Sequence, residues 1–399
     1  MTRVAKVAIV GGGLAGLATV NALSKFGFEA ELFEQSATLS EVGAGINTSP
    51  QGVKALQAIG LTEQVAKVGN ASPGIFSRNM QTGEPLEFFD RTAMTQRFGA
   101  PYYSFHRADL LDALASGVAP DRIHLKHRLV EIEEQASCVL LGFANGERYQ
   151  ADIVIAADGI HSAVRQALYG HDDPTYTGQM VWRALLDGRD VSPELVEPTG
   201  HIQWLGPGCH LLAYYLRGTE ALNIVTQEDT EKWVEEGWSI PGNPDEMRLS
   251  FPNPEPRLRS LLSLVAKCSK WGLFTRPLTE NWGRGRILLI GDAAHAMLPN
   301  IGQGACMAFE DASILARWLD AQRDEPAAAF RNFRRIRIPR VHAVQRTSFA
   351  YAKLKHMRDR EAQKEQIAKA RSGGNNLEWI WGYEPVRDWD KMPFVPPGA

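Results

Sequence analysis

The stretch KVAIVGGGLAGLATVNALSKFGFEAELFE, residues 6–34, decides the fold. Its opening run is rich in Val and Ile and bounded by glycine, which predicts a buried parallel strand. The spacing of LAGLATVNALSKFG predicts a helix that ends at Gly27, and FEAELFE predicts the next strand. Together these segments predict a βαβ unit, and hence an α/β protein built on a parallel sheet.

Three glycines and one carboxylate in this stretch point to a ligand. Gly11, Gly13 and Gly16 form a GxGxxG pattern between the first strand and its helix. Such glycines permit a tight turn, close approach of the backbone to a pyrophosphate, and close helix–strand packing. Glu34 ends the second strand, where a carboxylate can accept hydrogen bonds from ribose hydroxyls. The order of strand, glycines, helix, strand and carboxylate favours a dinucleotide site over a merely glycine-rich turn. It does not distinguish between NAD and FAD as the dinucleotide.

Composition narrows the class of protein. The 399 residues are 44% hydrophobic and 22% charged with a net charge of -3, which is ordinary for a globular protein and argues against a nucleic-acid partner. No apolar run approaches 18 residues, so we expect neither a signal peptide nor a membrane span. The scattered cysteines form no CxxC pair and favour a reducing, cytoplasmic setting. They are Cys138, Cys209, Cys268 and Cys306.

The pattern changes along the chain. Alternating runs such as HIQWLG, CHLLAYYL and ALNIVTQ predict an antiparallel sheet inserted between α/β halves. We therefore expect a discontinuous cofactor-binding domain at residues 1–174 and 281–371, with a substrate-binding β-sheet domain at 175–280. Residues 281–371 are expected to become largely helical, and 372–399 to form an irregular, aromatic-rich tail.

Two later motifs follow predicted strands. ADGIHSAVR places Asp158 at a strand end, and LLIGDAAHAMLPNIGQG, residues 288–304, places Asp292 at another, ahead of a glycine-rich helix start. His295 in the second motif is interpreted as structural, because a metal would need further ligands at suitable spacing; metal binding is the alternative. The run at 331–346 contains six arginines and no acid, and is expected to be a solvated helix face with partly buried side-chain stems.

These three motifs, in this order and spacing, resemble the FAD-dependent aromatic hydroxylases, the single-component flavoprotein monooxygenases of the salicylate, 3-hydroxybenzoate and 6-hydroxynicotinate hydroxylase type. The resemblance covers nearly the whole chain. It implies a Rossmann-like FAD-binding domain with an inserted antiparallel sheet and a helical C-terminal region. It also implies tightly but non-covalently bound FAD, a transient NADH or NADPH co-substrate with NADH favoured, and O2.

The resemblance implies an activity as well. The family hydroxylates a small hydroxylated aromatic or pyridine-ring carboxylic acid through a flavin C4a-hydroperoxide, in some members with decarboxylation. The partner would be that small molecule, with no nucleic acid or membrane, and the protein a monomer or homodimer. Two other classes stay open: a flavin dehydrogenase or reductase that inserts no oxygen, and a non-enzymatic FAD-binding scaffold.

The resemblance also implies which residues bind the cofactor, because positions of this sequence match the FAD-binding positions of the family's motifs. In the family, the aspartate matching Asp292 binds the FAD ribityl chain, and the helix start matching Gly302 approaches the isoalloxazine ring, where a helix N-terminus can stabilise negative charge. The expected FAD-binding residues are Gly11, Gly13, Leu14, Ala15, Gly16, Glu34, Gln35, Ala44, Gly45, Arg107, Val130, Asp158, Asp292, Gly302, Gln303 and Gly304.

The catalytic candidates come from the inserted sheet. On the strand CHLLAYYL, His210 and Tyr214 share one face and can look into the same cavity. Imidazole suits a general base near neutral pH, and a tyrosine hydroxyl can hold a substrate group. Some family members carry these residues at matching positions, so we assign His210 as the base and Tyr214 as a substrate anchor. The alternative is that both are ordinary sheet residues.

Four further residues are expected at the substrate. His201, on the preceding strand, is a weaker candidate for the same cavity. Asn47 stands where a hydroxynicotinate hydroxylase has histidine; it cannot act as a base but can hydrogen-bond a ring group. Pro299 and Asn300 occupy a turn facing the flavin, where Asn300 either contacts substrate or is a simple loop residue.

Overall fold

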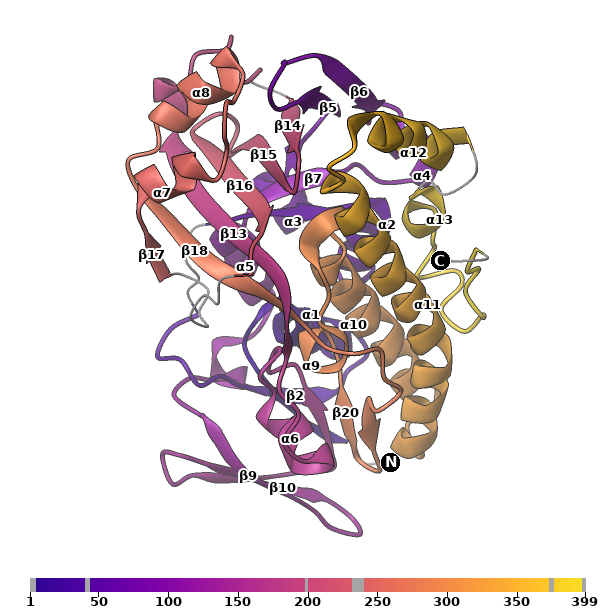
Figure 1. Ribbon diagram of the computed structural model, residues 1–399. Helices are drawn as coiled ribbons and strands as arrows, with labels where there is room; N and C mark the ends of the chain where they lie inside the picture. The colour runs from indigo at the N-terminus through magenta and orange to yellow at the C-terminus, as the bar shows by residue number, and fades with distance from the viewer. Residues whose placement is uncertain (1–4, 40–43, 198–199, 232–239, 373–376, 397–399) are drawn as a thin grey trace.

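The computed structural model describes residues 5–39, 44–197, 200–231, 240–372 and 377–396 (Figure 1). Its centre is a six-stranded sheet in the order β19-β20-β12-β1-β2-β8. Every neighbouring pair in it is parallel except β19 with β20. The strands are β1 (Lys6–Val10), β2 (Glu29–Phe33), β8 (Ile123–His124), β12 (Ile153–Ala156), β19 (Gly283–Arg284) and β20 (Ile287–Leu289). The predicted α/β class and parallel core are confirmed.

The first βαβ unit forms as predicted. Helix α1 (Leu14–Lys25) lies between β1 and β2, and Gly27 follows it with φ +74°, a left-handed conformation typical of residues just past a helix end. Gly11 has φ +108°, and a Cβ on Gly16 would lie 1.9 Å from the carbonyl oxygen of Gly11. The turn and the helix–strand packing therefore both require glycine.

A second, eight-stranded sheet has the order β17-β18-β13-β16-β15-β14-β5-β6. The alternating runs predicted as strands are β14, β15 and β16. The sheet also takes in β5 and β6, which precede the expected insertion at 175–280, and the domain boundaries stay a prediction. The strands are β5 (Gly74–Asn79), β6 (Pro85–Asp90), β13 (Thr175–Asp187), β14 (His201–Gly206), β15 (Cys209–Leu216), β16 (Ala221–Asp229), β17 (Ile240–Gly242) and β18 (Cys268–Thr275).

The two faces of β15 differ as its alternation predicts. One face packs into a hydrophobic cluster with Trp182 and Trp204. The residues on that face are Cys209, Leu211, Ala213 and Tyr215. His210 and Tyr214 therefore lie on the opposite face, as expected for a strand with one side in the core.

Shorter elements connect and cover the two large sheets. Two three-stranded sheets, β11-β10-β9 and β3-β7-β4, complete the strand pairing. Their strands are β3 (Gly45–Thr48), β4 (Asn70–Ala71), β7 (Tyr103–His106), β9 (Leu129–Glu134), β10 (Val139–Phe143) and β11 (Arg148–Ala151). The helices before the last sheet strand are α2 (Pro50–Ala58), α3 (Thr62–Val68), α4 (Met94–Phe98), α5 (Arg107–Ala115), α6 (Ala163–Tyr169), α7 (Pro244–Leu249) and α8 (Pro256–Ser263).

The C-terminal part is helical, as expected. Helices α10 and α11 run side by side along one flank of the molecule (Figure 1). The helices here are α9 (Asp292–His295), α10 (Gly304–Ala321), α11 (Pro326–Lys355), α12 (Arg360–Ser372) and the short α13 (Glu378–Trp381). None of the helices in the described part of the chain combines the length and apolarity that crossing a bilayer requires.

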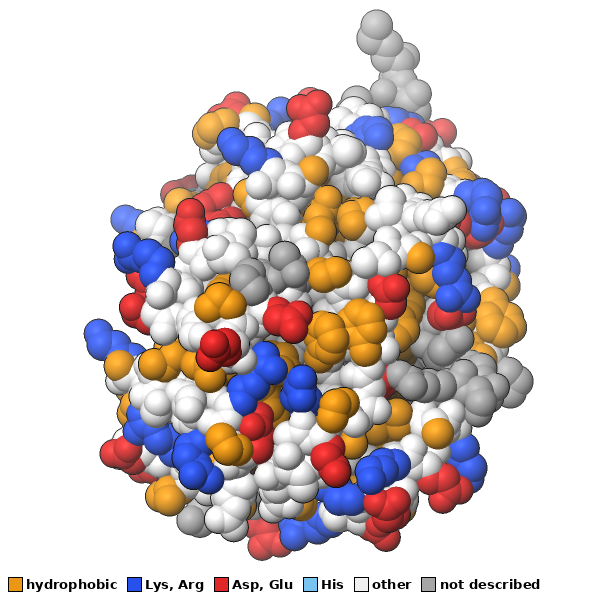
Figure 2. All heavy atoms as spheres, turned by 90° about the horizontal axis from the view of Figure 1, so that it is seen from above, with side chains coloured by type: hydrophobic (Ala, Val, Ile, Leu, Met, Phe, Trp, Pro, Cys, Tyr) orange, Lys and Arg blue, Asp and Glu red, His pale blue; other side chains and the backbone are white. Residues whose placement is uncertain are grey.

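Charged side chains of both signs are interspersed on the surface seen from above (Figure 2). Where its atoms are described, that face carries no extended patch of one sign. This agrees with the near-neutral net charge of -3.

A buried ion cluster joins α9, α10 and α11. The Nε atom of Arg337 lies 2.7 Å from Asp311 Oδ1, and the Arg340 guanidinium contacts both Glu310 oxygens at 2.8 Å. His295 Nε2 lies 2.6 Å from Asp311 Oδ2. Burial raises the pKa of Asp311, but His295 and Arg337 outweigh it and hold that pKa at about 2. The carboxylate is therefore ionised, and His295 has a structural partner.

This cluster corrects one expectation. The arginine-rich run was expected to form a solvated face, and this is wrong for Arg337 and Arg340, which are both 0% exposed. Their charges are balanced by Glu310 and Asp311 on α10, which local sequence reasoning did not pair with them. Among the residues described, no group of three or more side chains is placed to hold a metal ion.

Replacing Arg337 by methionine should lower the free energy of unfolding by about 3–5 kcal/mol, because Glu310 and Asp311 would stay buried with one cation fewer. Chemical denaturation measures this. Arg335→Met, at an exposed position of the same helix, is the matched control and should change stability by no more than about 0.5 kcal/mol. Equal losses in both variants would contradict the role given to the cluster.

Candidate functional site

One cavity of about 880 Å³ joins the carboxyl end of the six-stranded sheet to the open face of the eight-stranded sheet. Nine of the residues expected to bind FAD line it. They are Gly13, Leu14, Ala15, Gly45, Arg107, Asp292, Gly302, Gln303 and Gly304. The six residues expected at the substrate also line it, namely Asn47, His201, His210, Tyr214, Pro299 and Asn300. The structure thus brings both expected groups into one chamber, of a size typical of ligand sites.

The cofactor side of the chamber fits FAD. Asp292 is the first residue of α9, and no hydrogen bond of the described residues engages its carboxylate, which can accept from polyol hydroxyls. Gln303 stands at the N-cap position of α10 without a capping hydrogen bond from its side chain, which is held instead by Ser49, Gln51 and the Ile301 carbonyl. Because the Gln303 side chain is already engaged, this end of α10 can bind a ligand through the backbone N–H groups of its first turn, which have no partner inside the helix.

The other expected FAD residues lie outside the cavity wall. Glu34 accepts a 2.7 Å hydrogen bond from the backbone N–H of Gly12, which places its carboxylate beside the glycine loop. Asp158 accepts from the N–H of Val164 in α6, and burial raises its pKa. The full set is Gly11, Gly16, Glu34, Gln35, Ala44, Val130 and Asp158. Gln35 is exposed, and Val130, on β9, is 58% exposed. Their contacts with FAD stay a prediction.

A chain of hydrogen bonds crosses one end of the cavity. Arg91 Nη1 lies 3.0 Å from His201 Nδ1, His201 Nε2 lies 2.8 Å from Ser104 Oγ, and Ser104 Oγ lies 2.7 Å from Asn47 Oδ1. A guanidinium can only donate, so His201 accepts at Nδ1 and donates through Nε2. Burial, followed by the nearby Arg91, holds the pKa of His201 well below its usual range. His201 is neutral with both nitrogens engaged, and it is not free to act as a base.

Tyr214 is packed at the same end. Its ring stacks on His201 with centroids 4.7 Å apart, and a Cβ on Gly45 would come within 2.3 Å of its hydroxyl. Burial raises the pKa of Tyr214 above its usual value, so the phenol stays protonated. The close approach to Gly45 explains why the strand that carries Asn47 begins with glycine.

His210 presents a different environment from His201. Its Nδ1 lies 2.8 Å from Nε2 of His356, whereas no hydrogen bond of the described residues engages its Nε2. Burial, Lys355 and His356 together hold the pKa of His210 well below its usual range. His210 is therefore neutral near pH 7, and its Nε2 is the ring nitrogen available for a ligand in the cavity.

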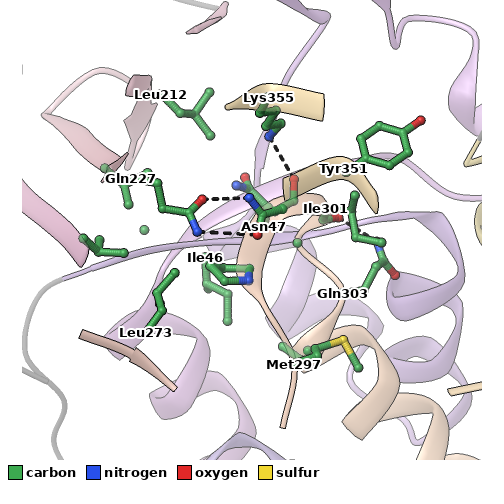
Figure 3. Close-up of a pocket in the computed structure, with 18 of the residues that line it drawn as sticks. Ile46, Asn47, Leu212, Gln227, Leu273, Met297, Ile301, Gln303, Tyr351 and Lys355 are labelled. Carbon is green, nitrogen blue, oxygen red and sulfur yellow. Dashed lines mark hydrogen bonds between the residues drawn. The ribbon is translucent and has the colours of Figure 1, made fainter. Parts of the chain in front are cut away.

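A pair of amides, Gln227 and Asn300, borders the chamber, and Gln227 lies opposite His210 in the register of β15 and β16. Figure 3 shows Gln227 and Lys355 at this wall. Asn300 donates to Gln227 Oε1 at 2.9 Å, and Gln227 donates back to Asn300 Oδ1 at 3.4 Å. Lys355 Nζ donates to the Asn300 carbonyl at 2.9 Å. Burial, and secondarily Arg91, lowers the pKa of Lys355 to about 8. The Asn300 side chain is thus already hydrogen-bonded to Gln227. A substrate that contacts Asn300 would share this side chain with Gln227.

Sequence reasoning missed three residues that line this wall, Arg91, Gln227 and Lys355. It also missed Ser104 and His356, which lie behind the wall and hydrogen-bond to the lining residues His201 and His210. No local motif marks them. Arg91 follows an edge strand, Ser104 lies on β7, and Lys355 and His356 end a long helix. Only the packing of distant segments brings these residues to the cavity or against the residues that line it.

The site so described suits a flavin cofactor: a glycine turn able to take a pyrophosphate, an aspartate able to accept from a polyol and a helix N-terminus open into the same chamber as a buried, neutral histidine. Comparison with known proteins agrees. The model of the FAD binding domain family matches residues 4–203 and 254–346.

Similar proteins of known activity cover nearly the whole chain. The chain is 33% identical to a 3-amino-4-hydroxybenzoate 2-monooxygenase of Streptomyces platensis, covering 95% of this chain and 96% of that protein. It is 32% identical to the 6-hydroxynicotinate 3-monooxygenase of Pseudomonas fluorescens, covering 87% and 91%. A salicylate hydroxylase in complex with its substrate superposes with a TM-score of 0.82 at 26% identity, covering 99% of both chains. The protein belongs to the FAD-dependent aromatic hydroxylases, which confirms the resemblance of its three motifs.

Proposed function

We propose that the protein hydroxylates a small hydroxylated aromatic or pyridine-ring carboxylic acid with FAD, O2 and NAD(P)H, and that His210 is the base that activates the ring. The observation that carries the proposal is the unengaged Nε2 of a buried, neutral imidazole in the chamber that the cofactor residues also line. Bound FAD supplies an oxygen atom electrophilic enough to attack an electron-rich ring.

The protein residues then have separable tasks. His210 takes the proton of a ring hydroxyl through Nε2, which raises the electron density of the ring. Tyr214, protonated and fixed against Gly45, donates to or packs against the ring substituent. The Gln227–Asn300 amide pair holds the turn at Pro299 in place at the cofactor side. Apolar neighbours such as Leu212 and Leu273 exclude water from the ring (Figure 3).

The charge of the cavity supports a carboxylate on the substrate. Arg91 and Lys355 both line the chamber, and neither has a carboxylate within ion-pair distance among the described residues. Arg91 instead lies over the Tyr102 ring at 3.7 Å, and its Nε is buried without a hydrogen bond. Desolvated cations without a counter-ion favour an anionic ligand. The two relatives named above act on a hydroxybenzoate and a hydroxynicotinate, which are such ring acids.

The proposal extends to the setting of the enzyme. We infer a monomer or homodimer in the cytoplasm, with NADH favoured over NADPH and with no nucleic acid or membrane as partner. The four free cysteines support a reducing compartment. The competing classes are a flavin reductase without oxygen insertion and an FAD-binding scaffold. Neither class requires a base that deprotonates a ring hydroxyl, which is the task proposed for His210.

The first experiment follows NADH and NADPH oxidation by the purified holoprotein with a panel of hydroxybenzoates and hydroxypyridine carboxylates under ¹⁸O2. One ring acid should stimulate oxidation strongly and acquire one labelled oxygen, with or without loss of its carboxylate. Stimulation without label would identify a reductase, and no response to any ring would favour the scaffold.

His210→Ala should keep FAD and slow hydroxylation by roughly two orders of magnitude, the usual contribution of a general base. Single-turnover hydroxylation, with flavin absorbance to confirm cofactor content, measures this. His171→Ala, which removes an exposed histidine outside the cavity, is the control. Near wild-type turnover in His210→Ala would remove His210 from this role.

Arg91→Met should raise KM for the ring acid by roughly 10- to 100-fold, the scale of a charge-assisted hydrogen bond of about 1.5–3 kcal/mol. The matching neutral carboxamide lacks the charge and should bind both proteins alike. Equal weakening of acid and carboxamide would show that Arg91 only shapes the cavity.

A further inference from the structure

Three residues from distant parts of the chain lead from the cavity to the surface. His210 lies on β15, His356 directly follows α11, and Asp229 ends β16. His210 Nδ1 is 2.8 Å from His356 Nε2, and His356 Nδ1 is 2.5 Å from Asp229 Oδ1. Both histidines are 6% exposed, whereas the Asp229 side chain is 38% exposed. The line thus connects a buried ring nitrogen to a carboxylate in contact with solvent.

The backbone holds this line in register. The N–H of Gly208, in the turn between β14 and β15, donates to the His356 carbonyl at 3.2 Å, and the N–H of Asp229 donates to the Gly208 carbonyl at 2.8 Å. Gln179 on β13 lies against both groups, with its Nε2 3.0 Å from Asp229 Oδ1 and 3.1 Å from His356 Nδ1. These hydrogen bonds therefore fix His356, the residue after α11, against the sheet that carries His210 and Asp229.

The hydrogen-bonding chemistry sets the direction of the protons. An ionised carboxylate only accepts, so a neutral His356 donates through Nδ1 to Asp229 at 2.5 Å, and its Nε2 accepts. His210 must then donate through Nδ1, which leaves its Nε2 without a proton and facing the cavity. The Asp229–His356 pair thus selects the tautomer of His210 that can take a proton from a ligand.

We propose that Asp229 and His356 are positioning residues that form a proton path from His210 to solvent; this rests on the proposed role of His210 as the base. The ring hydroxyl gives its proton to His210 Nε2 as the Nδ1 proton of His210 moves to His356 Nε2. The Nδ1 proton of His356 moves to Asp229, which releases it to water. The reverse sequence returns a proton to the product and restores the starting tautomers.

The surrounding charges agree with outward transfer. Lys355 faces His210, so a proton retained there would be repelled. Burial raises the pKa of Asp229, but the hydrogen bonds from His356 and Gln179, together with the nearby His356 and Arg358, outweigh it and lower that pKa. Asp229 is therefore ionised at neutral pH and attracts the proton toward the surface.

The test compares Asp229→Asn and His356→Gln with wild-type holoenzyme, and Asp173→Asn, at an exposed aspartate paired with His171, is the matched control. Asparagine can still accept from His356 but carries no charge. Both path variants should lower kcat for hydroxylation by roughly 10- to 100-fold at neutral pH while KM stays within about twofold. In Asp229→Asn the lost rate should return as pH rises, because deprotonation of the ring no longer needs help from the carboxylate.

Histidine ¹⁵N NMR supplies a readout independent of turnover. The wild type should show a low-field Nδ1 proton from the His356–Asp229 contact, which disappears in Asp229→Asn and persists in Asp173→Asn. Hydroxylation with unchanged kcat and pH profile in both path variants, or no such signal in the wild type, would overturn the path. Failure of the wild type to hydroxylate any ring acid would instead overturn the proposed function, and the path with it.

Discussion

The buried ion cluster of Glu310, Asp311, Arg337 and Arg340 is the constraint on which the rest of the site depends. It locks α10 to α11, and through His295 it holds α9 as well. Helix α9 begins with Asp292, α10 begins at the glycine turn, and α11 ends at Lys355. All three helix ends line the cavity, the first two where we propose that FAD binds. Because buried charges tolerate little displacement, the three helices are held as one unit, and cofactor and substrate groups keep their mutual positions.

The two sides of the chamber are built on different principles. The cofactor side uses backbone geometry, with glycines that let strands, helices and ligand approach closely and a helix N-terminus that offers free N–H groups. The substrate side uses side chains from β3, β7, β14, β15 and α11. Hydrogen bonds link several of these side chains to one another. Among the described residues, Arg91 and Lys355 have no carboxylate within ion-pair distance, and the proposed anionic character of the substrate rests on these two cations.

Two histidines that face the same chamber acquire opposite properties from their surroundings. His201 accepts from Arg91 and donates to Ser104, so it is a fixed part of the wall. His210 shares one nitrogen with His356, while no hydrogen bond of the described residues engages the other, which we propose takes a proton from the substrate. Burial keeps both neutral. The difference between a structural and a reactive imidazole is therefore a matter of which atoms their neighbours supply, and residue type alone does not reveal it.

The sequence by itself determined the parallel βαβ core, the glycine turn, the aspartate at the start of α9 and the face of β15 that carries His210 and Tyr214, because each depends on spacing within one short segment. Only the tertiary structure decided which arginines are buried, that β5 and β6 join the second sheet, and that Arg91 and Lys355 line the cavity. It also decided that His356 and Asp229 lie in line behind His210. These contacts join segments up to hundreds of residues apart, and their energies depend on burial and partners that no local pattern encodes.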